Sequence, residues 1–277
     1  MSTSDRGEAP GEEPPEPPEG PRDAGAVAPA RPRSGRLRLH IDMAPQPDDA
    51  TCGPTCLSAV YAYFGDPAPL EDVIEQVTTL EEGGTLAVLL GIHALARGYE
   101  ARLFTFNLRV FDPTWFAASP DYLVERLNLR LEDETNAKRR LAGEAYREYL
   151  AQGGELRFED LTAALIRKYL KRGLPILTGL SATYLYRTPR ERGTTKLEWD
   201  DIHGEPQGHF VVLAGYDAEE RQVLVSDPYR QNPFGESHEY WVDVDRLVNA
   251  ILIGVLTYDA NLLILRPGGS ERRTKDT

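Results

Sequence analysis

The order of the hydrophobic patterns along the chain is the feature that most constrains its fold. Apolar residues recur at helical spacing in the first part, most clearly in "CGPTCLSAVYAYFG" and "GGTLAVLLGIHALARGY". Patterns typical of strands gather in the second part, in "LPILTGLS", "GHFVVLAGYDAEERQVLVSDPY" and "ANLLILRP". Helices gathered first and antiparallel strands gathered last predict an α+β fold, in which an N-terminal helical part packs on a C-terminal antiparallel sheet.

Composition divides the chain into one domain and two tails. With 277 residues, 41% of them hydrophobic, the chain can bury a sizeable core. Residues 1–37 are rich in Pro, Glu and Gly, and residues 268–277 are also polar, so we predict that both are disordered. The domain spans 38–267, with a first strand in "RLRLHIDM". A polar insertion at about 107–155 carries two helical patches, "DYLVERLNLRL" and "AKRRLAGEAYREYLAQ".

Net charge and the lack of long apolar runs limit the partners of the chain. The formal charge of −13 argues against nucleic acid as a partner, because like charges would repel the phosphates. No apolar run reaches the roughly 18 residues of a membrane span, and the N-terminus lacks the pattern of a secretory signal. We therefore expect a cytoplasmic protein without a membrane span. Its oligomeric state does not follow from the sequence.

The two cysteines lie four positions apart at the start of the first predicted helix. This spacing favours thiol chemistry or core packing in a reducing compartment over a disulfide framework. Pro54 suits a first helical turn, which places Cys52 at the helix N-terminus, where unpaired N–H groups favour a thiolate. The alternative for Cys52 is a small packed residue. Cys56, beside apolar residues one turn later, fits that alternative better.

A reactive thiolate needs an imidazole partner, and one of the five histidines suits this role best. His40 falls in the first predicted strand and His93 among apolar residues of a helix, while His203 and His238 fall in polar loops. His209 instead begins an apolar strand directly after a glycine. A strand edge of this kind holds an imidazole rigidly against a helix terminus.

Two further residues complete a candidate site. Asp227 ends the strand that follows the His209 strand, so it can orient the imidazole, although an ordinary Asp-Pro turn is the better explanation of Asp227 taken by itself. Gln46 precedes Cys52 by six positions across a turn. Its side-chain amide, together with the backbone N–H of Cys52, can stabilise an oxyanion.

"QPDDATCGPTCLSAVYAYFG" resembles the nucleophile segment of the bacteriocin-processing cysteine peptidases, which cleave double-glycine leaders, and of their stand-alone relatives in the papain-like superfamily. The resemblance continues in "GGTLAVLLGIHALARGYEARLF", "GHFVVLAGYD" and "VLVSDP". It implies a papain-like cysteine protease fold without a metal or cofactor. It also implies that Cys52 is the nucleophile, His209 the general base and acid, Asp227 the orienting residue and Gln46 the oxyanion donor.

These observations predict a thiol-dependent hydrolase that cleaves peptide or amide bonds in a peptide or protein substrate. The same residues would serve an acyltransferase or a transglutaminase-like enzyme, in which an amine replaces water. A catalytically inactive papain-fold binding module is a further alternative. A metal site at Cys52, Cys56 and His209 is another, but it lacks a clear fourth protein ligand.

Overall fold

The computed structural model describes residues 36–80, 83–193, 198–235 and 237–269. These residues lie in one compact unit that extends from Pro32 to Thr277. Residues 1–35 and 270–277, which make up most of the two predicted tails, lie outside the described residues. Residues 36 and 37, which the tail prediction included, are described and belong to a strand.

An eight-stranded sheet organises the unit, with seven strands in the order β3-β2-β10-β4-β7-β8-β9 and β1 paired with β7. All strand pairs are antiparallel except β2 with β3. The predicted α+β fold is therefore confirmed. The strand bounds are β1 Arg36–Arg38, β2 Tyr99–Thr105, β3 Glu155–Arg157, β4 Ile176–Ser181, β7 Gly208–Asp217, β8 Gln222–Ser226, β9 Glu239–Asp243 and β10 Asn261–Pro267.

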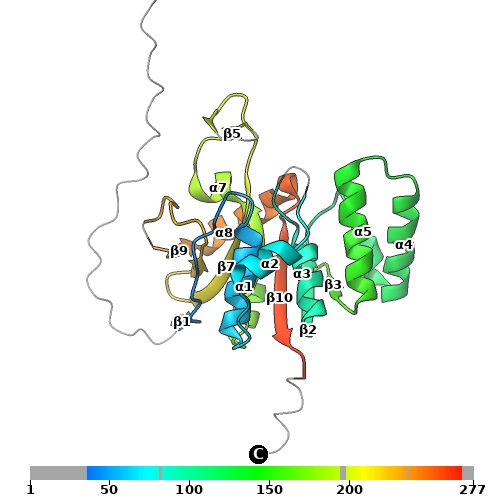
Figure 1. The fold of residues 1–277 in the computed structure, drawn as a ribbon, viewed down its shortest axis with the longest axis horizontal. Helices are drawn as coiled ribbons and strands as arrows, with labels where there is room; N and C mark the ends of the chain where they lie inside the picture. Colours follow the sequence, from blue (N-terminus) through cyan, green and yellow to red (C-terminus); the bar gives the residue numbers. More distant parts are fainter. Residues whose placement is uncertain (1–35, 81–82, 194–197, 236, 270–277) are drawn as a thin grey trace, which may run out of the picture. The chain divides into compact units, whose positions relative to one another are not determined.

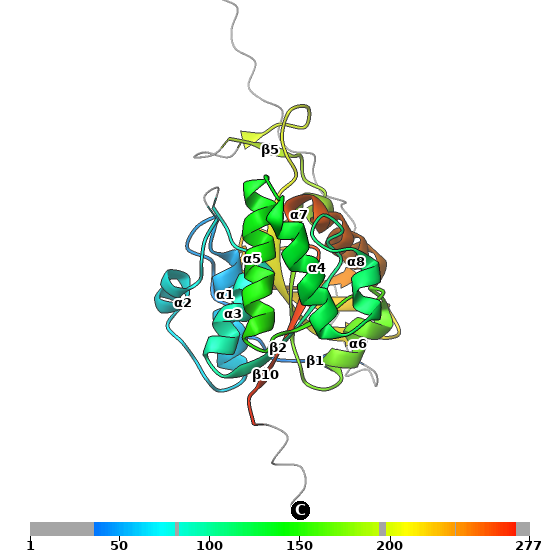
Figure 2. The same ribbon diagram turned by 90° about the vertical axis from the view of Figure 1, so that its right-hand side faces the viewer.

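Helices cover both faces of this sheet (Figures 1 and 2). Along β7, Phe210, Val212 and Ala214 point into one core with helices α1 and α3, whereas Val211 and Leu213 point into a second core with α6 and α8. This alternation follows from the two-residue repeat of a strand. The helix bounds are α1 Cys52–Tyr63, α2 Leu70–Gln76, α3 Ala87–Ala96, α6 Ala163–Leu170 and α8 Val244–Ile253.

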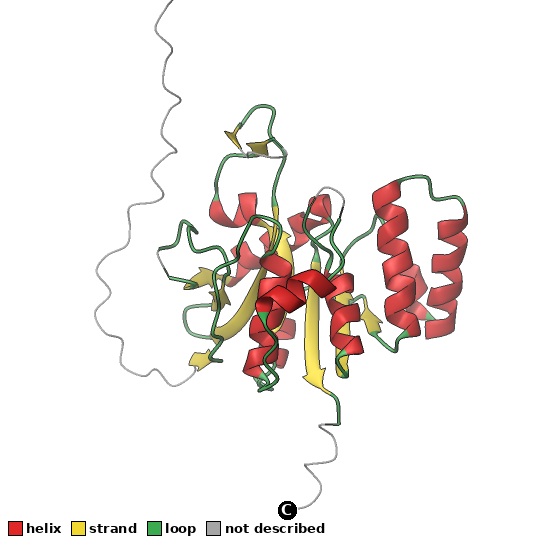
Figure 3. Ribbon diagram, viewed as in Figure 1, coloured by secondary structure: helices red, strands yellow, loops and turns green. Residues whose placement is uncertain are grey.

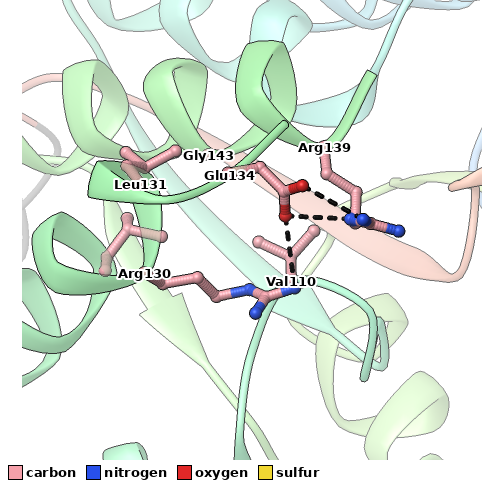
Figure 4. Close-up of a pocket in the computed structure, with 7 residues that line it drawn as sticks. Val110, Arg130, Leu131, Glu134, Arg139 and Gly143 are labelled. Carbon is pink, nitrogen blue, oxygen red and sulfur yellow. Dashed lines mark hydrogen bonds and ion pairs between the residues drawn. The ribbon is translucent and has the colours of Figure 1, made fainter. Parts of the chain in front are cut away.

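The insertion forms the two predicted helices, α4 (Pro120–Glu132) and α5 (Ala137–Ala151), which pack as a hairpin beside α3 (Figure 3). Between them, the Glu134 carboxylate accepts hydrogen bonds from Arg139 at 2.9 and 3.0 Å and forms an ion pair with Arg130 (Figure 4). The bonds from Arg139 lower the pKa of Glu134 to about 2. The adjoining cavity measures about 10 Å³, so this cluster joins two helices and holds no ligand.

The predicted strand in "RLRLHIDM" is too long, because the observed strand β1 ends at Arg38. The chain makes one more backbone bond, from Leu39 N to Ala214 O, and then leaves β7 next to a bulge between Leu213 and Gly215. His40 is consequently exposed and lies outside any strand, contrary to the prediction.

Several short elements have no counterpart in the sequence prediction. They are helices α7 (Ala182–Tyr186), α8, η1 (Pro113–Ala117) and η2 (Gly254–Thr257), strand β9, and the two-stranded hairpin of β5 (Glu191–Arg192) and β6 (Glu198–Trp199). None of the helices in the described residues is long and apolar enough to cross a membrane.

The ring of Tyr149 fastens the insertion to the sheet. Its hydroxyl donates to Ala101 O at 2.7 Å and to Glu155 O at 3.2 Å, and a Cβ on Gly91 or Gly154 would collide with the ring. Tyr149→Phe removes these bonds from a fully buried site, so we expect the free energy of unfolding to fall by about 1 kcal/mol. Urea unfolding, with the half-exposed Tyr122→Phe as control, measures this. Equal stability of the two variants would contradict it.

Candidate active site

Cys52 is the first residue of helix α1, as predicted. The preceding residue, Thr51, makes no capping bond through its side chain. The first N–H groups of a helix have no intrahelical acceptor, and the aligned peptide dipoles place partial positive charge at this end. The thiol of Cys52 therefore lies in surroundings that favour its thiolate.

The first turn of α1 packs closely against strand β7. A Cβ on Gly53 would lie 2.7 Å from Thr85 Cγ2 and 3.3 Å from the Phe210 ring, so only glycine allows this approach. One turn later, the Cys56 thiol donates to Phe210 O at 3.3 Å. Phe210 directly follows His209, so this contact brings the Cys52 end of the helix to the imidazole.

Cys56 is the packed cysteine of the pair. Its side chain is fully buried, and burial raises the pKa of the Cys56 thiol, with smaller contributions from Cys52 and Asp227. The thiol is therefore held in its neutral form, as a donor to the backbone. Among the described residues, no group of three or more His, Cys, Asp or Glu side chains has the geometry to hold a metal ion.

The structure brings His209 and Asp227 together in the core. His209 lies near the start of β7, Asp227 directly follows the neighbouring strand β8, and His209 Nε2 lies 2.8 Å from Asp227 Oδ1. The pairing of β7 with β8 produces this contact, since Val212 lies opposite Ser226. His209 is 7% exposed and Asp227 is fully buried.

The Cys52 side chain and the Asp227 carboxylate both act on the His209 ring. Because Nε2 is engaged by Asp227, Nδ1 is the ring nitrogen left for the thiol. Burial alone would lower the pKa of His209, but the Asp227 carboxylate, with a smaller contribution from Cys52, raises it to about 10. The arrangement therefore favours an imidazolium beside the Asp227 carboxylate.

Asp227 accepts four hydrogen bonds through its two carboxylate oxygens. Oδ1 accepts from His209 and, at 2.9 Å, from the backbone N–H of Tyr229. Oδ2 accepts from the hydroxyls of Tyr186 and Tyr240, each at 2.7 Å. Burial on its own would raise the pKa of Asp227, but His209 and the two hydroxyls lower it below its usual value. Asp227 is thus held as a carboxylate without access to water.

Gln46 lies beside this group, but its side chain is engaged elsewhere. Its backbone N–H donates to Pro228 O at 3.0 Å, which ties the loop before α1 to the residue after Asp227. The side-chain Nε2 donates to Asp48 O at 2.8 Å, and Oε1 is buried and finds no hydrogen-bond partner in the described part of the chain. Gln46 is therefore fixed next to the site, with one amide hydrogen already bound.

The other histidines lie away from the thiol. His93 is packed as predicted, with Tyr61 Oη 2.8 Å from Nδ1 and Gln76 Oε1 3.2 Å from Nε2. His203 is exposed in the loop before β7. His238 Nδ1 lies 2.6 Å from the backbone oxygen of Asp227, so this loop histidine supports the backbone of the site.

The sequence did not predict three of the side chains near His209. Tyr186 and Tyr240 belong to short elements that the hydrophobic patterns did not reveal, and Asp259 precedes β10 without any motif. Asp259 is buried, and burial raises its pKa to about 7. A Cβ on Gly208 would lie 1.9 Å from Asp259 Oδ2, so the glycine before His209 makes room for this carboxyl group.

An open pocket of about 690 Å³ adjoins the start of β7. Its wall includes Pro206, three residues before His209, and Ser181, which pairs with Gly208 in the sheet. The exposed side chains of Tyr184 and Leu256 and the insertion residue Arg109 also line it. The pocket wall therefore combines apolar surface with charged side chains of both signs, Arg109, Arg190 and Glu205.

Comparison with known protein families finds a match over part of the chain. Residues 133–248 match the model of the Peptidase C39 like family, which confirms the resemblance that the sequence motifs indicated. This segment contains His209 and Asp227, whereas Cys52 and Gln46 precede it. No sequence among the curated proteins matches this chain.

Several solved structures align with most of the chain at low identity. The peptidase domain of Streptococcus ComA, a bifunctional ABC transporter involved in quorum sensing, has 15% identity over 82% of this chain and 99% of its own, with a TM-score of 0.39. A double glycine motif protease of an AMS/PCAT transporter, crystallised with a leader peptide, has 14% identity over 85% and 99%, with a TM-score of 0.39. Xylellain, a cysteine protease of Xylella fastidiosa, has 15% identity over 84% and 86%, also with a TM-score of 0.39.

The raised pKa of His209 predicts how the stability of the folded chain depends on pH. A group whose pKa is higher in the folded chain contributes stability that is complete below its unfolded pKa, near 6.5, and is lost as the pH rises through about 10. Asp227→Asn removes the carboxylate that raises this pKa. We therefore expect the stability of the wild-type chain, measured by urea unfolding, to fall more steeply between pH 6.5 and 10 than that of the variant. Parallel curves would contradict the charge pair.

Proposed function

We propose that this chain, whose residues 133–248 match the C39-like peptidase family, is a cysteine peptidase with Cys52, His209 and Asp227 as its catalytic triad. One observation carries the proposal. A buried imidazole is hydrogen-bonded to a buried carboxylate, and it lies close enough to the cysteine at a helix N-terminus for that cysteine to raise its pKa. Nucleophile, base and orienting residue in this order are what thiol catalysis of acyl transfer requires.

The reaction proceeds in two steps of acyl transfer. The Cys52 thiolate attacks the amide carbonyl carbon, forming a C–S bond and a tetrahedral oxyanion. As the oxyanion collapses, the C–N bond breaks and the His209 imidazolium gives its proton to the leaving amine. In the second step, neutral His209 takes a proton from water, the resulting hydroxide attacks the thioester, and the acid product leaves while the thiolate and imidazolium are restored.

The oxyanion needs donors that point to it before the reaction begins. The backbone N–H of Cys52 lies at the helix end, where it has no intrahelical acceptor. Gln46 supplies the second donor in this proposal. A backbone hydrogen bond to Pro228 O holds its loop in place. The side-chain amide either donates its second hydrogen to the oxyanion, or it gives up its hydrogen bond to Asp48 O and donates to the oxyanion instead.

The pocket beside His209 supports a peptide as the substrate. Tyr184 and Leu256, which line it, are 41% and 51% exposed, so the wall offers apolar surface to the side chains of a peptide. The insertion contributes Arg109 to the same wall. A peptide chain that follows this wall would lie next to the start of the His209 strand.

Replacement of each cysteine tests the assignment of the nucleophile. Cys52→Ala should abolish both peptide cleavage and labelling by iodoacetamide while leaving the melting temperature nearly unchanged. Cys56→Ala should retain labelling and activity and lower stability by about 1 kcal/mol through lost packing. Mass spectrometry of the labelled protein and a screen with peptide libraries provide the readouts. Equal loss in both variants would refute Cys52 as the nucleophile.

The same assay separates hydrolysis from the alternatives. Products that carry an added amine instead of a new carboxylate would identify an acyltransferase. A wild-type chain that binds peptides while Cys52 stays unlabelled would identify a binding module without catalysis.

Gln46 is tested separately, because its side chain is bound to Asp48 in the structure. If it donates to the oxyanion, Gln46→Ala should lower kcat by about 100-fold with little change in KM. If it only supports the turn, its loss should lower stability by about 1 kcal/mol and change kcat slightly. Measuring kcat and the melting temperature on the same variant decides between the two roles.

A further inference from the structure

Two tyrosine hydroxyls bind the same oxygen of Asp227. Tyr186 Oη and Tyr240 Oη each lie 2.7 Å from Asp227 Oδ2, while Oδ1 faces His209 Nε2 at 2.8 Å. The tyrosines come from different elements, because Tyr186 ends helix α7 and Tyr240 lies in strand β9. No step of the proposed reaction uses either hydroxyl.

Packing holds both rings in place. Phe234 stacks on Tyr240, with ring centroids 4.4 Å apart, and meets Tyr186 edge-on at 6.2 Å. Arg246 of helix α8 lies over the Phe234 ring and donates to the backbone oxygen of Leu185, which anchors α7 beside it. The two hydroxyls are therefore fixed donors, because rings packed in this way cannot turn away from the carboxylate.

Both tyrosines remain neutral and can only donate to Asp227. Burial raises the pKa of Tyr186 and of Tyr240 well above the usual value, and the charge of Asp227 raises both further. A carboxylate without donors would take up a proton in such a site, because burial disfavours its charge. The hydroxyls replace the water that Asp227 lacks.

We propose that Tyr186 and Tyr240 are positioning residues that lock the Asp227 carboxylate with Oδ1 toward His209, so that the Cys52 thiolate is maintained at mildly acidic pH. The inference rests on the proposed function, which it deepens. Besides these two tyrosines, the titratable groups that face Asp227 are His209 of β7, Tyr229 of the loop after β8 and the Cys56 thiol of α1.

Single Tyr→Phe variants test this inference. Tyr186→Phe and Tyr240→Phe each remove one bond that lowers the pKa of Asp227, so the carboxylate should take up its proton at higher pH. The rate of Cys52 alkylation by iodoacetamide is measured from pH 4 to 9, without any substrate. We expect the acidic limb of this profile to move to higher pH, with alkylation at pH 5 slower by about 10-fold.

Tyr63→Phe is the matched control. Its hydroxyl donates to Gly173 O at 2.9 Å from the opposite end of α1, so this variant also loses one tyrosine hydrogen bond, but far from Asp227. Its alkylation profile should match that of the wild-type chain. Tyr186 is only partly buried, so Tyr186→Phe decides the question by itself if Tyr240→Phe does not fold.

The outcomes separate this inference from the proposed function. A reactive wild-type Cys52 with unchanged profiles in both tyrosine variants would overturn the positioning role and leave the triad intact. A wild-type Cys52 that is not alkylated at any pH would overturn the triad, and the positioning role with it. A lower melting temperature without a shifted profile would assign the tyrosines to stability alone.

Discussion

The contact between the first turn of α1 and strand β7 is the constraint on which the site depends. Gly53 allows the helix to approach Phe210, and Cys56 donates to the backbone oxygen of the same residue. Since His209 precedes Phe210 in the chain, this contact fixes the distance between a helix terminus and an imidazole. The cysteine motif therefore combines packing with chemistry, because Gly53 lets the helix approach β7 and places Cys52 near His209, while Cys56 stabilises the packed helix.

The site also requires that the Asp227 carboxylate remain charged in a place from which water is excluded. Asp227 is fully buried, and four donors from four segments surround it: His209 of β7, Tyr186 of α7, Tyr240 of β9 and the backbone of Tyr229. In a site of low dielectric constant these bonds are stronger than in water, but each unsatisfied oxygen would also cost more. Helix α7 joins this site to the open pocket, because its Tyr184 lines the pocket.

Local patterns predicted those parts of the site that depend on neighbours in the sequence. The apolar repeat after Cys52 was sufficient to place it at a helix end, and the runs around residues 218–221 were sufficient to pair the His209 and Asp227 strands. Tyr186 and Tyr240 were not predicted, because they lie 41 and 13 residues from Asp227 in the sequence. Both belong to elements that are too short to show a hydrophobic period. The predicted strand at His40 failed because a bulge in its partner strand, far away in sequence, ends the pairing.

The insertion also contacts the turn before β10, which adjoins the site. Lys138 of α5 and Arg109 lie 5.3 and 5.9 Å from the centroid of the Tyr258 ring. The next residue, Asp259, lies against Gly208, and no side chain larger than hydrogen fits at position 208. Lys138 and His209 both act to lower the pKa of Asp259 against the effect of burial. Asp259 therefore lies between the turn that the insertion contacts and the backbone that precedes His209.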